Sequence, residues 1–183
     1  EHLSLPGSRV IEAFVAGYEV QARIGLACRE ARRIGYMVLS LAGSIGVAAA
    51  AARLLGLDAE RTAHAMSIAA SQASGVGYQT GSVAHILEMG FSARNGVAAA
   101  YMAAEGMTGQ LDVLEAPRGL MSMITAGKVE TPEAILSEWG APYRIVEVGI
   151  KFYPCCFHPQ RLIEESLNLK RERGLSADDI ETI

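Results

Sequence analysis

The sequence predicts a mainly α-helical domain followed by the start of a smaller α/β domain. Three observations predict this fold class: apolar residues recur at helical spacing through the first hundred residues, capping residues mark the ends of those segments, and one late segment alternates like a strand. We place the helical domain at residues 1–142 and the start of the α/β domain at residues 143–183.

The predicted helices follow one another along the chain. Ser8 stands where the first helix needs a cap, Gly56 ends the second and Asp58 caps the third. Within the first helix, Glu19 and Arg23 are four residues apart, which predicts an ion pair. The predicted helical segments are 8–26, 45–55, 59–71, 90–104, 131–139 and 160–173.

A long polar loop rich in glycine is predicted before the helix at 90–104, and it contains His85 and Glu88. If this part of the loop is helical, the two side chains, three residues apart, share one face. Acid–base chemistry requires titratable groups where water is scarce, and the helix that follows is almost free of charge. His85 and Glu88 are therefore candidate site residues.

Residues 143–151 alternate apolar and polar side chains and are rich in β-branched residues, so they predict a strand. The strand ends at Lys151, which begins the segment Lys151-Phe-Tyr-Pro-Cys-Cys-Phe-His158. A lysine directly before aromatic residues and proline is poorly placed for a solvated face. Together with His85, Lys151 indicates a pocket that binds anions.

Composition excludes several function classes. The chain has 183 residues, 50% of them apolar, and a net charge of −4, which gives no basic surface for nucleic acid. The longest apolar stretch, 45–52, is far shorter than the roughly 20 residues of a membrane span, and no targeting segment is visible. Three cysteines cannot all form disulfides with one another, which favours the reducing cytoplasm. Cys155, Cys156 and His158 provide fewer than the four ligands of a structural zinc site.

Several segments, in this order and spacing, resemble the MmgE/PrpD family, which includes 2-methylcitrate dehydratase, cis-aconitate decarboxylase and related isomerases. The resemblance extends over nearly the whole chain. The segments that show it are Ala-Gly-Tyr-Glu-Val at 16–20, Arg-Ile-Gly-Leu at 23–26, the alanine-rich stretch 46–58, and the segments 69–75, 81–106, 114–119 and 151–156.

The resemblance implies a fold, an activity and an assembly. It implies an all-helical domain followed by a smaller α/β lid domain, with the active site in the cleft between them. It also implies a cofactor-independent lyase (dehydratase or decarboxylase) or isomerase, without metal, that abstracts a proton next to a carboxylate of a small di- or tricarboxylate. The protein is then expected to be a homodimer. This chain is expected to be an internal part of a longer protein, and to be inactive when it is isolated from the rest.

The resemblance assigns the site residues unevenly. Lys151 matches a family active-site position, whereas His85 stands where the family often has lysine and Glu88 where it has a small residue or histidine. We predict Lys151 and His85 as catalytic residues, and Lys151, His85 and Glu88 as substrate-binding residues. The usual catalytic histidine position is occupied by Met37, in Gly35-Tyr-Met-Val-Leu39.

Each prediction has a structural alternative. Lys151 is otherwise a strand-end lysine and His85 a hydrogen-bonded loop histidine, while Glu88 is better explained as a helix-start residue that suits the helix dipole. Cys155 and Cys156 are expected to be buried structural thiols. Because Met37 replaces histidine, the alternative function is a non-catalytic family member that binds a small acid or has a structural role.

Overall fold

The computed structural model describes residues 3–128 and 132–182 of the chain. They form two compact units, the first ending at Val146 and the second beginning at Glu147. The described residues are mainly helical and contain no strand, only an isolated antiparallel bridge between Tyr36 and Val76. The prediction of an all-helical domain is therefore confirmed, whereas the α/β lid domain and the boundary at residue 142 stay predictions.

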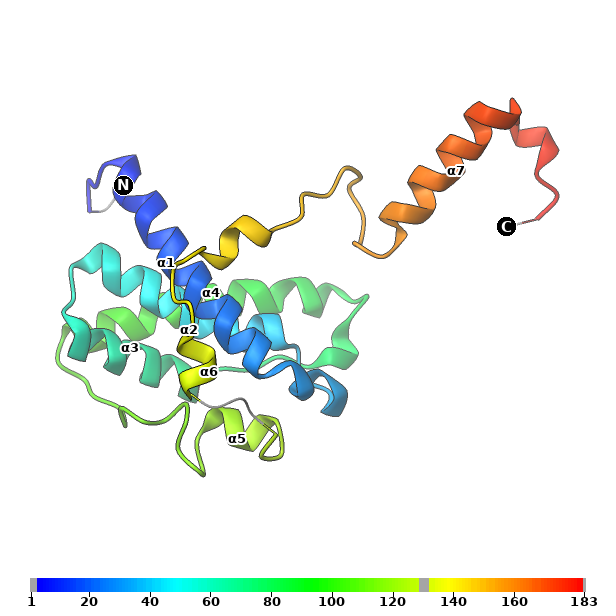
Figure 1. The fold of residues 1–183 in the computed structure, drawn as a ribbon. Helices are drawn as coiled ribbons and strands as arrows, with labels where there is room; N and C mark the ends of the chain where they lie inside the picture. The colour runs from blue at the N-terminus through cyan, green and yellow to red at the C-terminus, as the bar shows by residue number, and fades with distance from the viewer. Residues whose placement is uncertain (1–2, 129–131, 183) are drawn as a thin grey trace. The chain divides into compact units, whose positions relative to one another are not determined.

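The first unit is built on four helices. They are α1 (Gly7–Ala27), α2 (Val38–Leu55), α3 (Ala59–Ser71) and α4 (Val83–Ala104). Helix α2 packs against each of the other three, and α3 also packs against α4 (Figure 1). Two short helices, α5 (Leu120–Ile124) and α6 (Pro132–Leu136), follow them. The 3₁₀ turns lie between α1 and α2 at Arg29–Ile34, between α3 and α4 at Gly77–Gln79, and after α6 at Arg144–Glu147.

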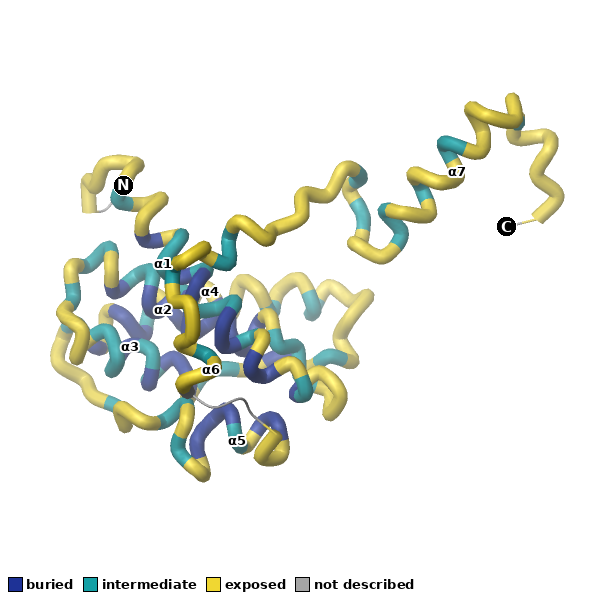
Figure 2. The backbone as a smooth tube through the Cα atoms, in the orientation of Figure 1, coloured by how far each residue is buried: buried dark blue, intermediate teal, exposed yellow. Residues whose placement is uncertain are grey.

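Helix α2 lies in the core of this unit. Ten of its residues are buried, and Figure 2 shows the buried positions gathered where the helices face one another. By length and composition α2 is the one helix among the described residues that could cross a membrane, with a mean hydropathy of 1.8 over Val38–Leu55. The apolar composition of α2 is explained more simply by its packing against α1, α3 and α4, since a helix buried inside a bundle needs the same composition.

Two glycines let the long helices approach closely. Gly46 and Gly96 both begin the sequence Gly-Val-Ala-Ala-Ala, in α2 and α4. A Cβ added at Gly46 would lie 2.7 Å from the Gly17 carbonyl oxygen of α1, and one at Gly96 would lie 2.6 Å from the Ser44 carbonyl oxygen of α2. The similarity of the two segments therefore reflects the same packing role, because only glycine leaves room for the neighbouring backbone.

The predicted helix boundaries agree with the structure where local signals determine them. Helix α3 has the predicted bounds, and Asp58 caps it, because its carboxylate accepts the Arg61 backbone N–H at 2.8 Å. The Ser8 cap is wrong: α1 begins at Gly7, after Pro6, and no side chain caps it. Helix α2 begins seven residues before the predicted start, because burial of Ser40 and Ser44 among other helices outweighs their weak helical pattern.

The strand predicted at 143–151 is wrong. A strand needs a neighbour for its backbone hydrogen bonds, and the described residues offer none. The chain instead makes a 3₁₀ turn at Arg144–Glu147, and the Arg144 backbone N–H donates to the Glu19 carboxylate at 2.6 Å. Residues 148–150 have no regular structure.

The second unit contains one long helix, α7 (Pro159–Arg173), and a 3₁₀ turn at Ala177–Asp179. Helix α7 confirms the helix predicted at 160–173 and ends before Gly174, whose φ of 64° suits a left-handed cap. At the beginning of α7, the Gln160 side chain accepts the backbone N–H groups of Phe152 and Tyr153 at 3.2 and 3.0 Å and donates to the Tyr153 carbonyl oxygen at 2.8 Å. Gln160 thereby determines the conformation of the segment after Lys151.

Candidate functional site

His85 and Glu88 both lie on helix α4, which begins at Val83, seven residues before the predicted start. The prediction that they share a face is confirmed: His85 Nδ1 is 3.6 Å from Glu88 Oε2. Glu88 is the sixth residue of α4 and therefore lies beyond its first turn. The interpretation of Glu88 as a helix-start residue is wrong, because the favourable effect of the helix dipole falls off within that turn.

The carboxylate of Glu88 also holds the loop before α4. Its Oε1 accepts the Val76 backbone N–H at 2.7 Å. On either side of Val76 the loop pairs with the segment that enters α2: the Met37 N–H donates to the Gly75 carbonyl oxygen at 3.1 Å, and the Gly77 N–H donates to the Gly35 carbonyl oxygen at 2.7 Å. Glu88 thus joins α4 to the beginning of α2 through this loop.

Gly75 is fitted closely against the beginning of α2. Its φ is +152°, and an added Cβ would lie 2.9 Å from both the Cβ and the carbonyl oxygen of Met37 and 3.0 Å from the Ser40 Cβ. No other residue type fits there without displacing the loop. Met37 therefore lies next to the loop that Glu88 holds.

Three buried polar atoms near this junction have no hydrogen-bond partner among the described residues. They are Ser40 Oγ, His85 Nδ1 and Glu88 Oε2. Ser40 and the pair are neighbours, since the Ser92 hydroxyl lies 2.6 Å from the Ser40 carbonyl oxygen and 2.9 Å from that of Glu88. Buried polar groups are nearly always hydrogen-bonded, and exceptions need an explanation such as catalysis. We define Ser40, His85 and Glu88 as the α2–α4 site.

The α2–α4 site has the properties of a proton-transfer site. The Glu88 side chain is 11% exposed and the His85 side chain 31% exposed, although His85 Nδ1 is itself buried. The accessible part of the imidazole is therefore on its other atoms. A histidine with one buried nitrogen beside a carboxylate and another edge open can accept or donate a proton there, while the carboxylate orients the ring. Sequence analysis missed Ser40, because a serine inside an apolar helix gives no signal of chemistry.

The other predicted site residue, Lys151, lies in the second unit. Lys151 is exposed, directly before the segment organised by Gln160, and its role beside His85 stays a prediction. His158 is also exposed. Among the residues that the structure describes, no group of three or more histidine, cysteine or carboxylate side chains could hold a metal ion.

The cysteines differ from the expectation of buried thiols. Cys155 is half-buried and Cys156 is exposed, so that prediction is wrong; they lie in the loop before α7, where Cys155 Sγ is 3.1 Å from Gln160 Nε2. Cys28 is the buried thiol, and burial raises its pKa to about 11. Cys28 is therefore unreactive at neutral pH.

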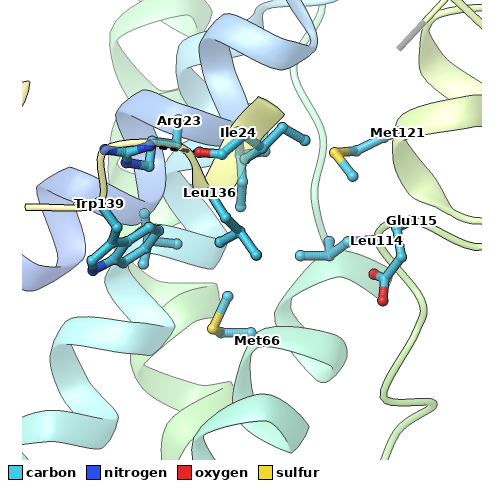
Figure 3. Close-up of a pocket in the computed structure, with 10 residues that line it drawn as sticks. Arg23, Ile24, Met66, Leu114, Glu115, Met121, Leu136 and Trp139 are labelled. Carbon is cyan, nitrogen blue, oxygen red and sulfur yellow. Dashed lines mark hydrogen bonds between the residues drawn. The ribbon is translucent and has the colours of Figure 1, made fainter. Parts of the chain in front are cut away.

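The first unit also has an apolar pocket of about 200 Å³ near α1 and α6, where Met66, Leu114 and Leu136 point toward its centre (Figure 3). Among the described residues that line it, the one cation is Arg23, and four of the five guanidinium N–H groups already donate to Glu19 and to backbone carbonyls. A carboxylate would find no free cation there. The α2–α4 site is therefore the better candidate for acid chemistry.

Comparison with known families identifies the helical unit. Residues 1–132 match the MmgE/PrpD N-terminal domain, a range that contains the whole α2–α4 site. No curated protein matches the chain. Since the match covers most of the chain, this protein belongs to the MmgE/PrpD family, a membership that indicates a dehydratase-like function in general terms.

Proposed function

We propose that the full-length protein is a cofactor-independent lyase or isomerase that acts on a small di- or tricarboxylate by moving a proton next to a carboxylate. The observation that supports it most is the His85–Glu88 pair, at 3.6 Å, with two buried atoms that have no hydrogen-bond partner among the described residues. Glu88 Oε1 has a structural role at the Val76 loop, but Glu88 Oε2 and His85 Nδ1 keep hydrogen-bonding capacity that the described residues do not use, which is unusual for buried polar atoms. Family membership gives it a chemical context.

In this proposal His85 is the base that takes a proton from the carbon next to the carboxylate. The electron pair of the broken C–H bond forms a double bond while a C–O bond breaks, and the leaving hydroxyl takes the proton that His85 accepted and departs as water, which restores the neutral imidazole. Glu88 orients the imidazole and stabilises its protonated form. Lys151 holds a substrate carboxylate, because a fixed cation stabilises negative charge that develops beside it.

The second candidate function is a protein that binds a small acid without turnover. Met37 favours it, because the family's usual histidine is absent from the position beside Gly75. The two functions differ in one observable. An enzyme exchanges the substrate's proton with solvent, whereas a binding protein does not.

The test incubates full-length protein in D₂O with 2-methylcitrate and cis-aconitate and follows deuterium incorporation and product by NMR. We expect His85→Asn, Glu88→Gln and Lys151→Ala each to lower turnover by about a hundredfold, the usual range for losing an acid–base group or a charge-assisted contact. Lys151→Arg should recover little of it, since a guanidinium differs in shape and reach.

His64→Asn is the matched control, because His64 lies on α3 with its Nδ1 3.1 Å from the Gly109 carbonyl oxygen, apart from the α2–α4 site. Its turnover should equal that of the wild type. Binding of an acid without exchange or product would support the binding protein instead. Turnover unaffected by His85→Asn would refute the site assignment.

Homodimer formation, a cytoplasmic location and the absence of nucleic-acid and membrane partners stay predictions.

A further inference from the structure

Ser40 is the member of the α2–α4 site that the proposed reaction does not use. It lies on helix α2 and is 1% exposed. A serine hydroxyl can donate one hydrogen bond and accept two, yet Ser40 Oγ has no partner in the part of the chain that the structure describes. Burying a hydroxyl without a hydrogen bond costs free energy, so a hydroxyl at this position needs an explanation.

Ser44, one turn further along α2, shows how a buried serine is usually accommodated. It is also 1% exposed, and its hydroxyl donates to the Ser40 carbonyl oxygen at 3.4 Å, the common arrangement for a serine inside a helix. Ser40 Oγ makes no such bond to its own helix among the described residues. The partner of the Ser40 hydroxyl is therefore to be sought on the side of α4.

Two separate sets of contacts bring Ser40 and Glu88 together. On one side, a Cβ added at Gly75 would lie 3.0 Å from the Ser40 Cβ, and the next residue, Val76, donates its N–H to Glu88 Oε1 at 2.7 Å. On the other side, the Ser92 hydroxyl donates to the carbonyl oxygens of both Ser40 and Glu88. The hydroxyl of Ser40 and the His85–Glu88 pair thus belong to one junction between α2 and α4.

The three atoms at this junction have complementary requirements. Glu88 Oε2 accepts hydrogen bonds, whereas the Ser40 hydroxyl and a protonated His85 Nδ1 donate them. The 3.6 Å between His85 Nδ1 and Glu88 Oε2 is too long for a direct hydrogen bond, but two atoms at that separation can both bond to one water molecule. A buried water typically makes about three hydrogen bonds to polar groups that are otherwise unsatisfied.

We propose that Ser40 is a positioning residue for His85 and that it acts through one buried water molecule. The water accepts hydrogen bonds from the Ser40 hydroxyl and from His85 Nδ1–H, and it donates one to Glu88 Oε2. This arrangement places the imidazole hydrogen on Nδ1 and leaves the lone pair on Nε2, which then accepts the substrate's proton. The inference rests on the proposed function, in which His85 is the base.

The first measurement determines the tautomer of His85 by ¹⁵N NMR on full-length protein labelled at histidine, at a pH where the imidazole is neutral. The signals of His85 are those lost in His85→Asn. We expect hydrogen on Nδ1 in the wild type, and a ratio of the two tautomers about tenfold less favourable to it in Ser40→Ala, since one hydrogen bond of the network is lost. Ser44→Ala should keep the wild-type ratio. Hydrogen on Nε2 in the wild type, or an unchanged ratio in Ser40→Ala, would overturn the inference.

Thermal unfolding of the same variants tests the water independently of turnover, through the sign of the change. If the Ser40 hydroxyl is bonded to a water that Glu88 also holds, Ser40→Ala should lower Tm by about 2 °C or more. If the hydroxyl has no partner at all, Ser40→Ala should raise Tm, because it removes a buried unpaired group and because alanine favours helix. A raised Tm would overturn the inference.

The third measurement connects Ser40 to catalysis. We expect Ser40→Ala to lower kcat/KM about tenfold, and Ser40→Cys, whose thiol donates only weakly, to lower it by less. Ser44→Ala should stay within about twofold of the wild type. If His85→Asn is impaired but Ser40→Ala turns over like the wild type, the positioning role fails and the proposed function stands. If His85→Asn itself turns over like the wild type, the proposed function fails, and the positioning role fails with it.

Discussion

The Glu19–Arg23 pair on α1 and the His85–Glu88 pair on α4 have opposite surroundings. Glu19 and Arg23 on α1 are in contact at 2.6 Å, and both make further hydrogen bonds to backbone groups of residues 135–144. His85 and Glu88 on α4 are 3.6 Å apart, and the two atoms that face each other have no hydrogen-bond partner in the described parts of the chain.

The use of hydrogen-bonding groups distinguishes side chains with a structural role from candidate catalytic side chains better than residue type does. A pair whose donors and acceptors are used holds the backbone in place, and any change in protonation would break contacts that the fold needs. A pair with unused capacity can change protonation without breaking the fold. By this criterion the α1 pair holds a distant part of the backbone in place, and the α4 pair is the candidate for acid–base chemistry.

The largest expected effect compares the two carboxylates. Glu19→Ala leaves the Arg23 charge buried without its partner, which typically costs about 3–5 kcal/mol of unfolding free energy. Glu88→Ala removes one hydrogen bond to Val76, worth about 1 kcal/mol. Urea unfolding followed by circular dichroism measures both. Equal losses would contradict the distinction between the two pairs.

A smaller effect is expected at Gly75, beside the α2–α4 site. Gly75→Ala adds a methyl group 2.9 Å from Met37 at a residue with positive φ. We expect the free energy of unfolding to fall by about 1–3 kcal/mol. We also expect reduced turnover, because the loop is displaced from Glu88. Gly90→Ala is the matched control, because a Cβ there meets nothing within 4 Å and alanine favours helix by about 1 kcal/mol. Turnover that survives Gly75→Ala would show that the loop is not part of the site.

The pH dependence of stability is expected to come in part from Glu19. Because its folded-state pKa is below the ordinary value of 4.5, the ionised carboxylate stabilises the fold above that pH, and this contribution disappears as pH falls through the folded-state pKa. Unfolding at a series of pH values should show Glu19→Gln differing most from wild type near neutrality and least in acid. A difference independent of pH would show that Glu19 does not act through its charge.

The parts of the fold that the sequence predicts correctly depend on neighbours along the chain. The Asp58 cap, the bounds of α3, the Glu19–Arg23 ion pair and the shared face of His85 and Glu88 all follow from spacings of three or four residues. The contacts that give these residues their roles come from far away. Nothing near Arg23 in the sequence shows that its other acceptors are Ile135, Ser137 and Glu138.

The wrong predictions have the same origin. Alternation at 143–151 is a local pattern, but a strand exists only with a partner, and Arg144 donates to Glu19 instead. Ser40 carries no local signal, and it becomes part of the site only because α4 brings Ser92 and Glu88 to it. Cys155 and Cys156 were expected inside on their residue type alone, which gives average burial and not the position of a particular loop.

The smallest expected effect sets the scale for the others. Arg9 and Glu12 form a pair on the same helix as Glu19 and Arg23, at 3.4 Å, but their side chains are 42% and 49% exposed. Water screens such a pair, and ordering two long side chains offsets most of the attraction, so Arg9→Ala should cost about 0.2–0.5 kcal/mol at low salt. The loss should vanish in concentrated salt, where screening acts over about 3 Å, whereas the loss in Glu19→Ala should persist because the buried Arg23 is out of reach of ions. Urea unfolding at low salt and at about 1 M salt checks both variants. If both losses fall together as salt rises, burial and hydrogen bonding to residues 135–144 do not distinguish the Glu19–Arg23 pair from an ordinary surface ion pair.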